Sequence, residues 1–321
     1  MTPLTPRVAV HLVTYNNEAT ITACLEALLA QEALFEVCII DNASTDRTVE
    51  RIRAIGLPVQ INATNVGYAV AHNQAIAQTH SDYVLTLNPD LLLQPGFLGV
   101  MCGVLDENPT LGSAAGCLLR VESIDQSPTA IDSVGLFMRR NRRQGLLLDN
   151  APLSQIPPHS SPIFGPDGAA AFYRRTMLED IAVEGEIFDE DFFIHKEDVD
   201  ICWRAQLAGW TSCYVPDAIA HHIRSFRPGQ RVTVSPYLRQ CAVRNRYLLM
   251  IKNETTSLFR RDLLRIFMYD VAVVLFIVLR ERSSFPALTS AWSLRKRMGH
   301  KRRIIQAKRR VNADDVRWLF S

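Results

Sequence analysis

The sequence lacks the short motifs that identify several common enzyme classes. No GxGxxG follows the first apolar segment and no GxxxxGK[ST] occurs in the 321 residues, which disfavours a dinucleotide-binding or P-loop enzyme. The seven cysteines contain no CxxC pair, so neither a zinc site nor a disulfide framework is expected and the thiols are predicted to be free. The N-terminus has no apolar run after a basic start, so no signal peptide is predicted.

Charge is nearly balanced overall but unevenly distributed. Hydrophobic residues make up 48% and charged residues 21%, which is typical of a packed globular protein. The net charge is +2, yet residues 260–321 hold fifteen Lys/Arg against five Asp/Glu, a balance of +10 that leaves −8 for residues 1–259. The basic tail predicts an anionic partner. Residues 296–310 have no aromatic residue between their charges for bases to stack on, so lipid headgroups are favoured over nucleic acid.

Buried apolar segments alternate with segments of helical periodicity over the first third of the chain. This alternation predicts an α/β fold built on a mostly parallel, doubly wound sheet. The expected strands are Arg7 to Thr14, Glu36 to Asp41, Val59 to Asn62 and Tyr83 to Asn88, and the expected helices are Ala19 to Leu29, Thr48 to Ile55, Tyr68 to Thr79 and Gly96 to Leu105.

The pattern changes twice further along. Pro, Ser, Asn and Arg cluster in residues 121–161, which predicts a loop-rich insertion or a mobile flap. Regular structure is expected again to about residue 223. Beyond residue 235 the chain reads as helical and basic. We therefore expect a catalytic domain at residues 1–234 and a helical basic extension at residues 235–321.

Leu263 to Leu279 is strongly apolar but contains Arg265 and Asp270. It is slightly short for a membrane span. A buried core helix is one interpretation. A helix in the membrane interface, supported by the basic run Arg295 to Arg310, is a second interpretation. A spanning helix is the least favoured of the three.

Polar clusters directly follow three expected strands, at Thr14 to Asn17, Asp41 to Asp46 and Asn88 to Asp90. Ligands bind at the carboxyl ends of parallel strands, so three clusters at one sheet edge favour a binding site over ordinary turn chemistry. A carboxylate at such an end can hold a divalent metal that neutralises phosphate oxygens. Asp90 fits this role, with a turn residue after Pro89 as the alternative.

A dense acidic segment follows at residues 188–204. Glu197 or Asp198 is expected at a helix N-terminus, where a partly desolvated carboxylate can serve as a general base. A helix cap with solvated charges is the alternative. Asp200 and Arg204 are spaced for an ion pair. The pair His221–His222 could be packing or could supply a metal ligand.

These segments together resemble family 2 glycosyltransferases of the GT-A fold, especially the bacterial rhamnosyltransferase-like branch. They occur in the family's order and cover about two thirds of the chain. The matching segments are VTYNN (13–17), IIDNASTDRT (39–48), NVGYAVAHNQAI (65–76), LTLNPD (85–90), FDEDFFIHKEDVDICWRAQLAGW (188–210) and VPDAIAHH (215–222).

The resemblance implies roles for individual residues. Sugar-nucleotide contacts would come from Thr14, Tyr15, Asn17, Asp41, Asn42, Asn65, Gly67, Asn73, Asn88 and Arg204. Asp90 would hold the metal as the last residue of a DXD-type motif whose first position is Asn88 here, and His222 would complete the site. Asp198 would be the general base, with Glu197 and Asp200 as rivals.

The implied reaction inverts the anomeric centre with a divalent metal, Mg or Mn. The expected donor is a dTDP- or UDP-sugar, with dTDP-L-rhamnose as the best candidate, and the expected acceptor is a lipid-linked or polysaccharide hydroxyl of the cell envelope. A cytoplasmic protein at the inner, anionic membrane surface, which could form homo-oligomers, is expected. Two alternatives stay open: a nucleotidyltransferase, although TYNNEAT (14–20) lacks the usual Gly-rich basic loop, and a non-catalytic sugar-nucleotide-binding protein.

Overall fold

The computed structural model describes residues 6–223, 235–312 and 315–320. Residues 1–5, part of the segment used in the signal-peptide prediction, lie outside these ranges. Residues 224–234, which end at the expected domain boundary, also lie outside them. The first part of the chain alternates strands and helices, as predicted. In order these are β1 (Val8–Thr14), α1 (Ile21–Leu29), β2 (Phe35–Asp41), α2 (Thr48–Ala54), β3 (Gln60–Ile61), α3 (Tyr68–Gln78), β4 (Tyr83–Leu87), β5 (Leu91–Leu93) and α4 (Phe97–Glu107).

The remaining elements combine long strands with helices. They are β6 (Leu111–Val121), β7 (Ala130–Ser133), β8 (Leu136–Met138), β9 (Gln144–Leu146), β10 (Ser161–Pro162), β11 (Ala170–Arg174), α5 (Arg175–Ile181), α6 (Glu197–Leu207), β12 (Thr211–Ile223), α7 (Pro236–Asn253), α8 (Thr256–Arg280) and α9 (Phe285–Ala307).

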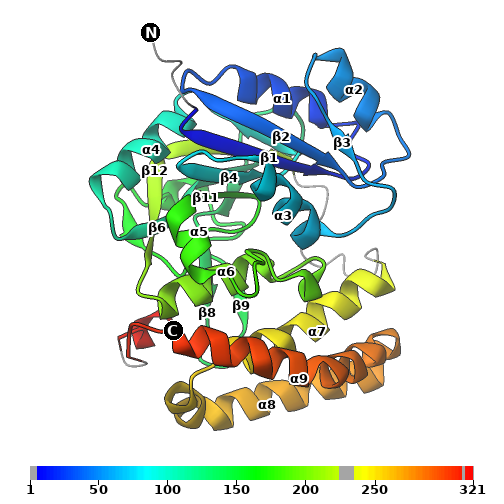
Figure 1. Ribbon diagram of the computed structural model, residues 1–321, viewed down its shortest axis with the longest axis vertical. Helices are drawn as coiled ribbons and strands as arrows, with labels where there is room; N and C mark the ends of the chain where they lie inside the picture. The colour runs from blue at the N-terminus through cyan, green and yellow to red at the C-terminus, as the bar shows by residue number, and fades with distance from the viewer. Residues whose placement is uncertain (1–5, 224–234, 313–314, 321) are drawn as a thin grey trace.

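The central sheet has the strand order β10-β12-β6-β11-β4-β1-β2-β3 (Figure 1). The pairs β1–β2, β1–β4, β2–β3 and β6–β12 are parallel. The single strand β11 runs antiparallel between β4 and β6. The predicted mostly parallel sheet is therefore confirmed, and the ends of β1, β2 and β4 lie at one edge as expected.

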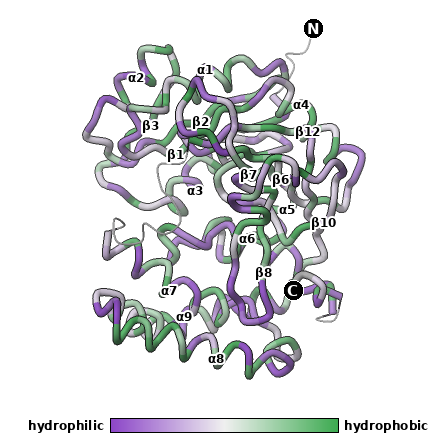
Figure 2. Tube along the Cα trace, turned by 180° about the vertical axis from the view of Figure 1, so that it is seen from behind, coloured by the Kyte–Doolittle hydropathy of each residue, from purple (hydrophilic) through white to green (hydrophobic). Residues whose placement is uncertain are grey.

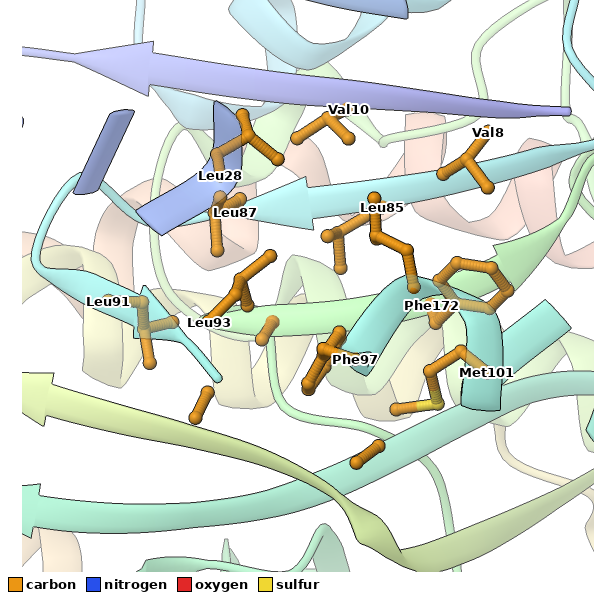
Figure 3. Packing of buried hydrophobic residues seen from close by; sticks show 14 of the residues in the cluster. Val8, Val10, Leu28, Leu85, Leu87, Leu91, Leu93, Phe97, Met101 and Phe172 are labelled. Carbon is orange, nitrogen blue, oxygen red and sulfur yellow. The ribbon is translucent and has the colours of Figure 1, made fainter. Parts of the chain in front are cut away.

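Helices cover both faces of the sheet because its strands are apolar on both sides. On one face, side chains of α1, α2 and α4 pack on the sheet, and Figure 3 shows Leu28, Phe97 and Met101 meeting Leu85 and other strand residues. On the other face, α3, α5 and α6 pack against β4 and β11. All seven cysteines are free, as predicted, and five of them are buried.

The segment 121–161 differs from the predicted flap. It contains β7 and the hairpin β8–β9, whose arginine-rich tip contacts the C-terminal helices. Arg142 at this tip is fully buried, bonds to Asp262 at 2.9 Å and also pairs with Glu254. The cluster of arginines in this segment contributed to the prediction of a loop or flap, but two buried carboxylates, one from α8 and one from the α7–α8 junction, neutralise Arg142 and anchor the hairpin.

Helices α7, α8 and α9 form a layer beneath the sheet domain (Figure 1). An apolar cluster joins the two parts, with Trp203 of α6 packed among Leu248 and Met298. Buried ion pairs join them too. Lys252 of α7 bonds to Asp189 and Asp200, and Lys301 of α9 bonds to Asp189 and Asp191. Lys301, one of the basic residues of the tail, is thus neutralised by carboxylates inside the protein and is not available to an anionic partner.

We expect Lys301→Met to lower the free energy of unfolding by about 3–5 kcal/mol. The Lys301 ammonium is fully buried and bonds to Glu186, Asp189 and Asp191, so its removal takes away a cation shared by three carboxylates. Asp189 then keeps only Lys252, and Asp191 keeps only the half-exposed Arg297. Denaturant unfolding would measure the change.

Lys296→Met is the matched control on the same helix, because Lys296 is exposed and makes no ion pair with any described residue. Equal stability of the two variants would contradict a structural role for the buried network.

The apolar run Leu263–Leu279 is not a core helix. It forms most of α8, and of this run only Ile266 and Ile277 are buried hydrophobic side chains. Leu264 and Leu279 are 69% and 71% exposed, and Phe267 and Met268 are also exposed. Figure 2 shows these apolar stretches along α8 at the edge of the molecule furthest from the sheet. None of the helices in the described part of the chain combines the length and apolar composition needed to cross a bilayer.

Candidate active site

A cavity of about 600 Å³ opens at the carboxyl ends of β1, β2 and β4. It brings together most of the residues singled out from the sequence. Those that line it are Thr14, Tyr15, Asn17, Asn42, Asn65, Gly67, Asn88, Asp90, Glu197, Asp198 and His222. Asp41, Asn73, Asp200 and Arg204 were also predicted but do not line it.

Asp41 supports the cavity wall from behind. Its carboxylate is fully buried and accepts hydrogen bonds from the Thr14 hydroxyl at 2.8 Å and from the backbone N–H and hydroxyl of Ser44. Asn42, which does line the cavity, donates to the carbonyl of Gly67 at 3.1 Å. The ends of β1 and β2 are therefore cross-linked to the start of α3 by side-chain hydrogen bonds.

The start of α3 requires a glycine. Gly67 has φ = +88°, and a Cβ there would come within 2.5 Å of the Phe193 ring. Asn65 accepts a hydrogen bond from the Gly67 N–H at 2.9 Å. Asn73 lies further along α3 and brackets Phe188, donating to its carbonyl at 2.8 Å and accepting from its N–H at 2.9 Å. Asn73 therefore holds the acidic segment in place without reaching the cavity.

Asp90 and His222 lie next to each other in the wall of the cavity. The His222 Nε2 lies 3.3 Å from the Asp90 Oδ1, and this oxygen is buried without a hydrogen-bond partner among the described residues. The other ring nitrogen, Nδ1, bonds to Asp132 of β7 at 2.8 Å. Burial alone would lower the pKa of His222, but the hydrogen bond to Asp132 and the proximity of the Asp132 and Asp90 carboxylates outweigh it and raise this pKa to about 9.

This arrangement fits one divalent cation. Two neighbouring ligands of an octahedral Mg²⁺ at 2.0–2.1 Å lie about 3 Å apart, close to the observed separation of Asp90 and His222. Asp132 holds the outer nitrogen of the histidine, as carboxylates commonly do behind metal-bound imidazoles. No group of three His, Cys, Asp or Glu side chains in the described ranges surrounds such a point, so other ligands would have to be substrate oxygens or water.

Asp198 points into the cavity from the first turn of α6. Its Oδ2 accepts a hydrogen bond from the Gly168 N–H at 3.0 Å, and its Oδ1 accepts one from the Val199 N–H at 2.7 Å. Burial raises the pKa of Asp198, and these two backbone donors oppose the rise. The result is a fixed, partly exposed carboxylate with an elevated proton affinity, which are the properties of a general base.

Glu197 differs from its neighbour. It is 6% exposed, and its Oε2 has no hydrogen-bond partner among the described residues. Burial and the adjacent Asp198 carboxylate raise the pKa of Glu197 to about 8. At neutral pH Glu197 is therefore mostly protonated and Asp198 is the better proton acceptor.

The loop before α6 has an unusual backbone. Phe193, His195 and Lys196 have φ values of 61°, 72° and 73°, in the left-handed region that non-glycine residues rarely adopt. Asn245 of α7 holds this loop: its buried amide donates to the carbonyls of Phe192, Ile194 and His195 at 2.7–2.9 Å. The C-terminal layer thus fixes the segment that carries Asp198.

Asp200 and Arg204 occupy the interior, and the structure does not bring them to the cavity. Arg204 pairs with Asp200 at 2.8 Å, as their spacing predicted, and also donates to the carbonyls of Ile181 and Ile187. Asp200 additionally bonds to Lys252 and Asn253. The assignment of Arg204 to substrate and of Asp200 to proton transfer is therefore contradicted by their burial on the far side of α6.

Several cavity residues were missed from the sequence. Tyr68, Asp167, Gly168 and Lys196 line the cavity, and Asp132 supports His222. The sequence GPDG at 165–168 was a usable signal, because it places a turn and a carboxylate before the buried strand β11. The sequence contained no comparable signal for Asp132, because it lies in residues 121–161, which were predicted to be a loop-rich insertion.

Comparisons with known proteins agree with this geometry. The family model described as "Glycosyl transferase family 2" matches residues 9–181. An N-acetylglucosaminyl-diphospho-decaprenol L-rhamnosyltransferase of Mycobacterium tuberculosis is 30% identical over 248 residues, covering 69% of this chain and 77% of that protein. Rhamnosyltransferase WbbL of Escherichia coli is 25% identical over 226 residues, covering 66% of this chain and 81% of that protein.

The fold is also found among solved structures. The mannosyltransferase PcManGT of Pyrobaculum calidifontis, in complex with GDP-Man and Mn²⁺, superposes with a TM-score of 0.55 at 17% identity, covering 95% of this chain and 86% of that one.

Proposed function

Because this chain belongs to glycosyl transferase family 2, with the GT-A fold expected from its sequence, we propose that it transfers L-rhamnose from dTDP-rhamnose to a lipid-linked acceptor. Glycosyltransferase activity follows from the family. The rhamnosyl donor is supported by the two relatives named as rhamnosyltransferases, and the lipid-linked acceptor by the diphospho-decaprenol substrate in the name of the mycobacterial one.

The observation that carries the proposal is the position of Asp198 in the same cavity as Asp90 and His222. The acceptor hydroxyl oxygen forms a bond to the anomeric carbon while the bond from that carbon to the diphosphate oxygen breaks. Asp198 accepts the hydroxyl proton, and the nucleoside diphosphate departs with the bonding electrons. Attack opposite the leaving group inverts the anomeric centre.

Asp90 and His222 would hold a divalent metal, Mg or Mn. When bound, this ion neutralises the charge that develops on the leaving diphosphate. Asp132 keeps the His222 ring oriented toward Asp90 through its bond to Nδ1. Thr14 and Asn42, held by their bonds to Asp41 and Gly67, would contact the nucleotide.

A donor screen tests the function. Thermal shift with dTDP-, UDP- and GDP-sugars, each with and without Mg²⁺ or Mn²⁺, should show the largest stabilisation with dTDP-rhamnose plus metal. At equal concentrations, the ligand with the lowest Kd for the folded state stabilises it most. Transfer or hydrolysis of dTDP-rhamnose then confirms the activity. Stronger stabilisation and turnover with another sugar nucleotide would replace rhamnose by that sugar.

We further propose that the exposed face of α8 binds the inner membrane surface. Apolar side chains such as Leu264 and Leu279 lie on the same helix as the exposed Arg265 and Arg280. This combination is typical of helices that insert their apolar face at the headgroup boundary and bind anionic lipids. A lipid-linked acceptor would be presented at that surface.

We expect the protein to float with anionic liposomes at low salt and to be largely released at high salt. The variant Leu264→Glu/Leu279→Glu should lower the partition coefficient at least about tenfold, because each leucine contributes about 1.5–3 kcal/mol when fully buried. Leu34→Glu is the control, since Leu34 is equally apolar and 51% exposed but lies beside β2.

If the protein does not float, membrane binding by this face is contradicted, and a contact between copies of the chain becomes the favoured explanation for its exposed apolar side chains. Resistance to both high salt and alkaline carbonate would contradict peripheral attachment. Point variants are preferable to deletion of α8 and α9, because deletion removes the buried Lys301 from its carboxylates.

A further inference from the structure

A second cavity, of about 430 Å³, lies between the tip of the β8–β9 hairpin, α7 and α8. We call it the hairpin groove. Its wall includes Lys196, which also lines the active-site cavity. The two cavities therefore adjoin at a residue that is two positions before Asp198. Figure 2 shows the polar tip of the hairpin reaching the helical layer beside α8.

The end of the hairpin groove nearest the active site is cationic. Lys196, Arg143 and Gln144 line the groove, and no Asp or Glu is among its described lining residues. Arg143 is exposed and forms no ion pair with a described residue. Arg246 also lines the groove, and its guanidinium bonds to Asp270 at 2.9 Å and donates to the carbonyls of Asn141 and Arg142.

The opposite end of the groove is apolar. Ala272, Val273, Phe276 and Ile277 of α8 line it, together with Ala242 and Val243 of α7. Phe276 is 46% exposed, and the neighbouring Leu275 and Leu279 are also exposed. The groove thus continues into the apolar face of α8. One end is suited to an anion and the other to a hydrocarbon.

We propose that the hairpin groove binds the phosphate-bearing start of the acceptor lipid. The exposed Arg143 binds the phosphate or diphosphate oxygens at the end of the groove that Lys196 also lines, and the side chains of α8 bind the first carbons of the chain. The acceptor sugar then lies in the active-site cavity, with its hydroxyl at Asp198. This assignment deepens the proposed function and rests on its lipid-linked acceptor.

The charge pattern separates this subsite from the donor site. A sugar nucleotide has no hydrocarbon for the α8 end of the groove. Its diphosphate would lie at the Asp90–His222 pair, at the ends of β4 and β12. An isoprenoid or acyl phosphate matches both ends at once, because its charge and its apolar chain are adjacent.

The test uses farnesyl diphosphate as the probe and isothermal titration calorimetry on the full chain. We expect farnesyl diphosphate to bind at least tenfold more tightly than either farnesol or inorganic pyrophosphate. Arg143→Glu and Ala272→Asp should each weaken its binding at least tenfold, by charge reversal at one end and by a carboxylate in the apolar end. Val274→Asp, on the same helix but outside the groove wall, should bind like the parent chain.

Circular dichroism and thermal unfolding verify that each variant folds, and Arg143→Gln replaces the glutamate variant if it does not. Equal binding of pyrophosphate and farnesyl diphosphate, displacement of the probe by dTDP, or equal loss in Val274→Asp would overturn the subsite. Probe binding without transfer from any sugar nucleotide would instead contradict the proposed function and leave the subsite standing.

Discussion

Asp198→Asn should lower turnover at least about a hundredfold, the usual scale for loss of a general base, while leaving the affinity for the nucleotide within about twofold. Asparagine keeps the shape of the side chain and can still accept one of the two backbone hydrogen bonds, because the N–H groups of Gly168 and Val199 reach different oxygens of the carboxylate. It cannot accept a proton at neutral pH. Steady-state kinetics with the donor found by the thermal-shift screen, together with calorimetry of nucleotide binding, would separate the two effects.

Glu190→Gln is the matched control. Glu190 is an exposed carboxylate of the same acidic segment and lies outside the cavity, so its neutralisation should leave turnover unchanged. Near-normal turnover in Asp198→Asn would transfer the role to Glu197, the neighbouring carboxylate in the cavity wall. The buried Asp200, bonded to Arg204 and Lys252, is no longer a candidate.

Removal of the divalent metal should abolish activity, and addition of Mg²⁺ or Mn²⁺ should restore it. The expected ligands are Asp90 and His222, whose facing atoms lie 3.3 Å apart. His222→Ala should raise the metal concentration for half-maximal activity by at least about tenfold. Asp132→Asn should raise it by about 10- to 100-fold, the range found when the carboxylate behind a metal-bound histidine is lost. Metal titration of activity, and of nucleotide binding by calorimetry, measures both.

His221→Ala provides the control, because His221 precedes His222 on β12 but does not line the cavity. Its metal requirement should match that of the parent chain. Full activity in excess chelator would rule out the metal, and an equal shift in the His221 and His222 variants would rule out the assignment of the ligand.

Much of the sheet could be predicted because its strands are continuous apolar runs. Many residues of the cavity wall could be predicted because they are polar and directly follow those strands. Val8 to Thr14 and Tyr83 to Leu87 are almost fully buried, so their composition reveals them. The cluster around Asp90 then follows from the rule that ligands bind at the carboxyl ends of parallel strands.

The parts that could not be predicted depend on long-range pairing of charges. Arg142 looked like a loop residue because nothing nearby in sequence neutralises it, yet Glu254 and Asp262 do so from more than one hundred residues away. For Arg204 the prediction failed in the opposite direction, because a buried structural arginine was predicted to contact substrate. Its position in a family motif suggested substrate contact, whereas its guanidinium is fully used by Asp200 and two backbone carbonyls. Local sequence shows a charge but not its distant partner.

The exposed face of α8 was ambiguous for a related reason. Apolar composition predicts burial but does not say whether protein or lipid provides it. In α8 only a narrow stripe faces the protein, through Ile266 and Ile277, and the remaining apolar side chains need another partner.

The amide of Asn245 and the ammonium groups of Lys252 and Lys301 have a consequence for how such enzymes can diversify. They bond to the backbone and carboxylates of the loop that precedes Asp198, so the helical layer and that loop are complementary surfaces. Exchange of the helices between relatives by recombination would break this match unless the loop from Phe188 to Lys196 were exchanged with them. The loop and the helices therefore form one heritable unit, two segments separated in the gene but linked in selection.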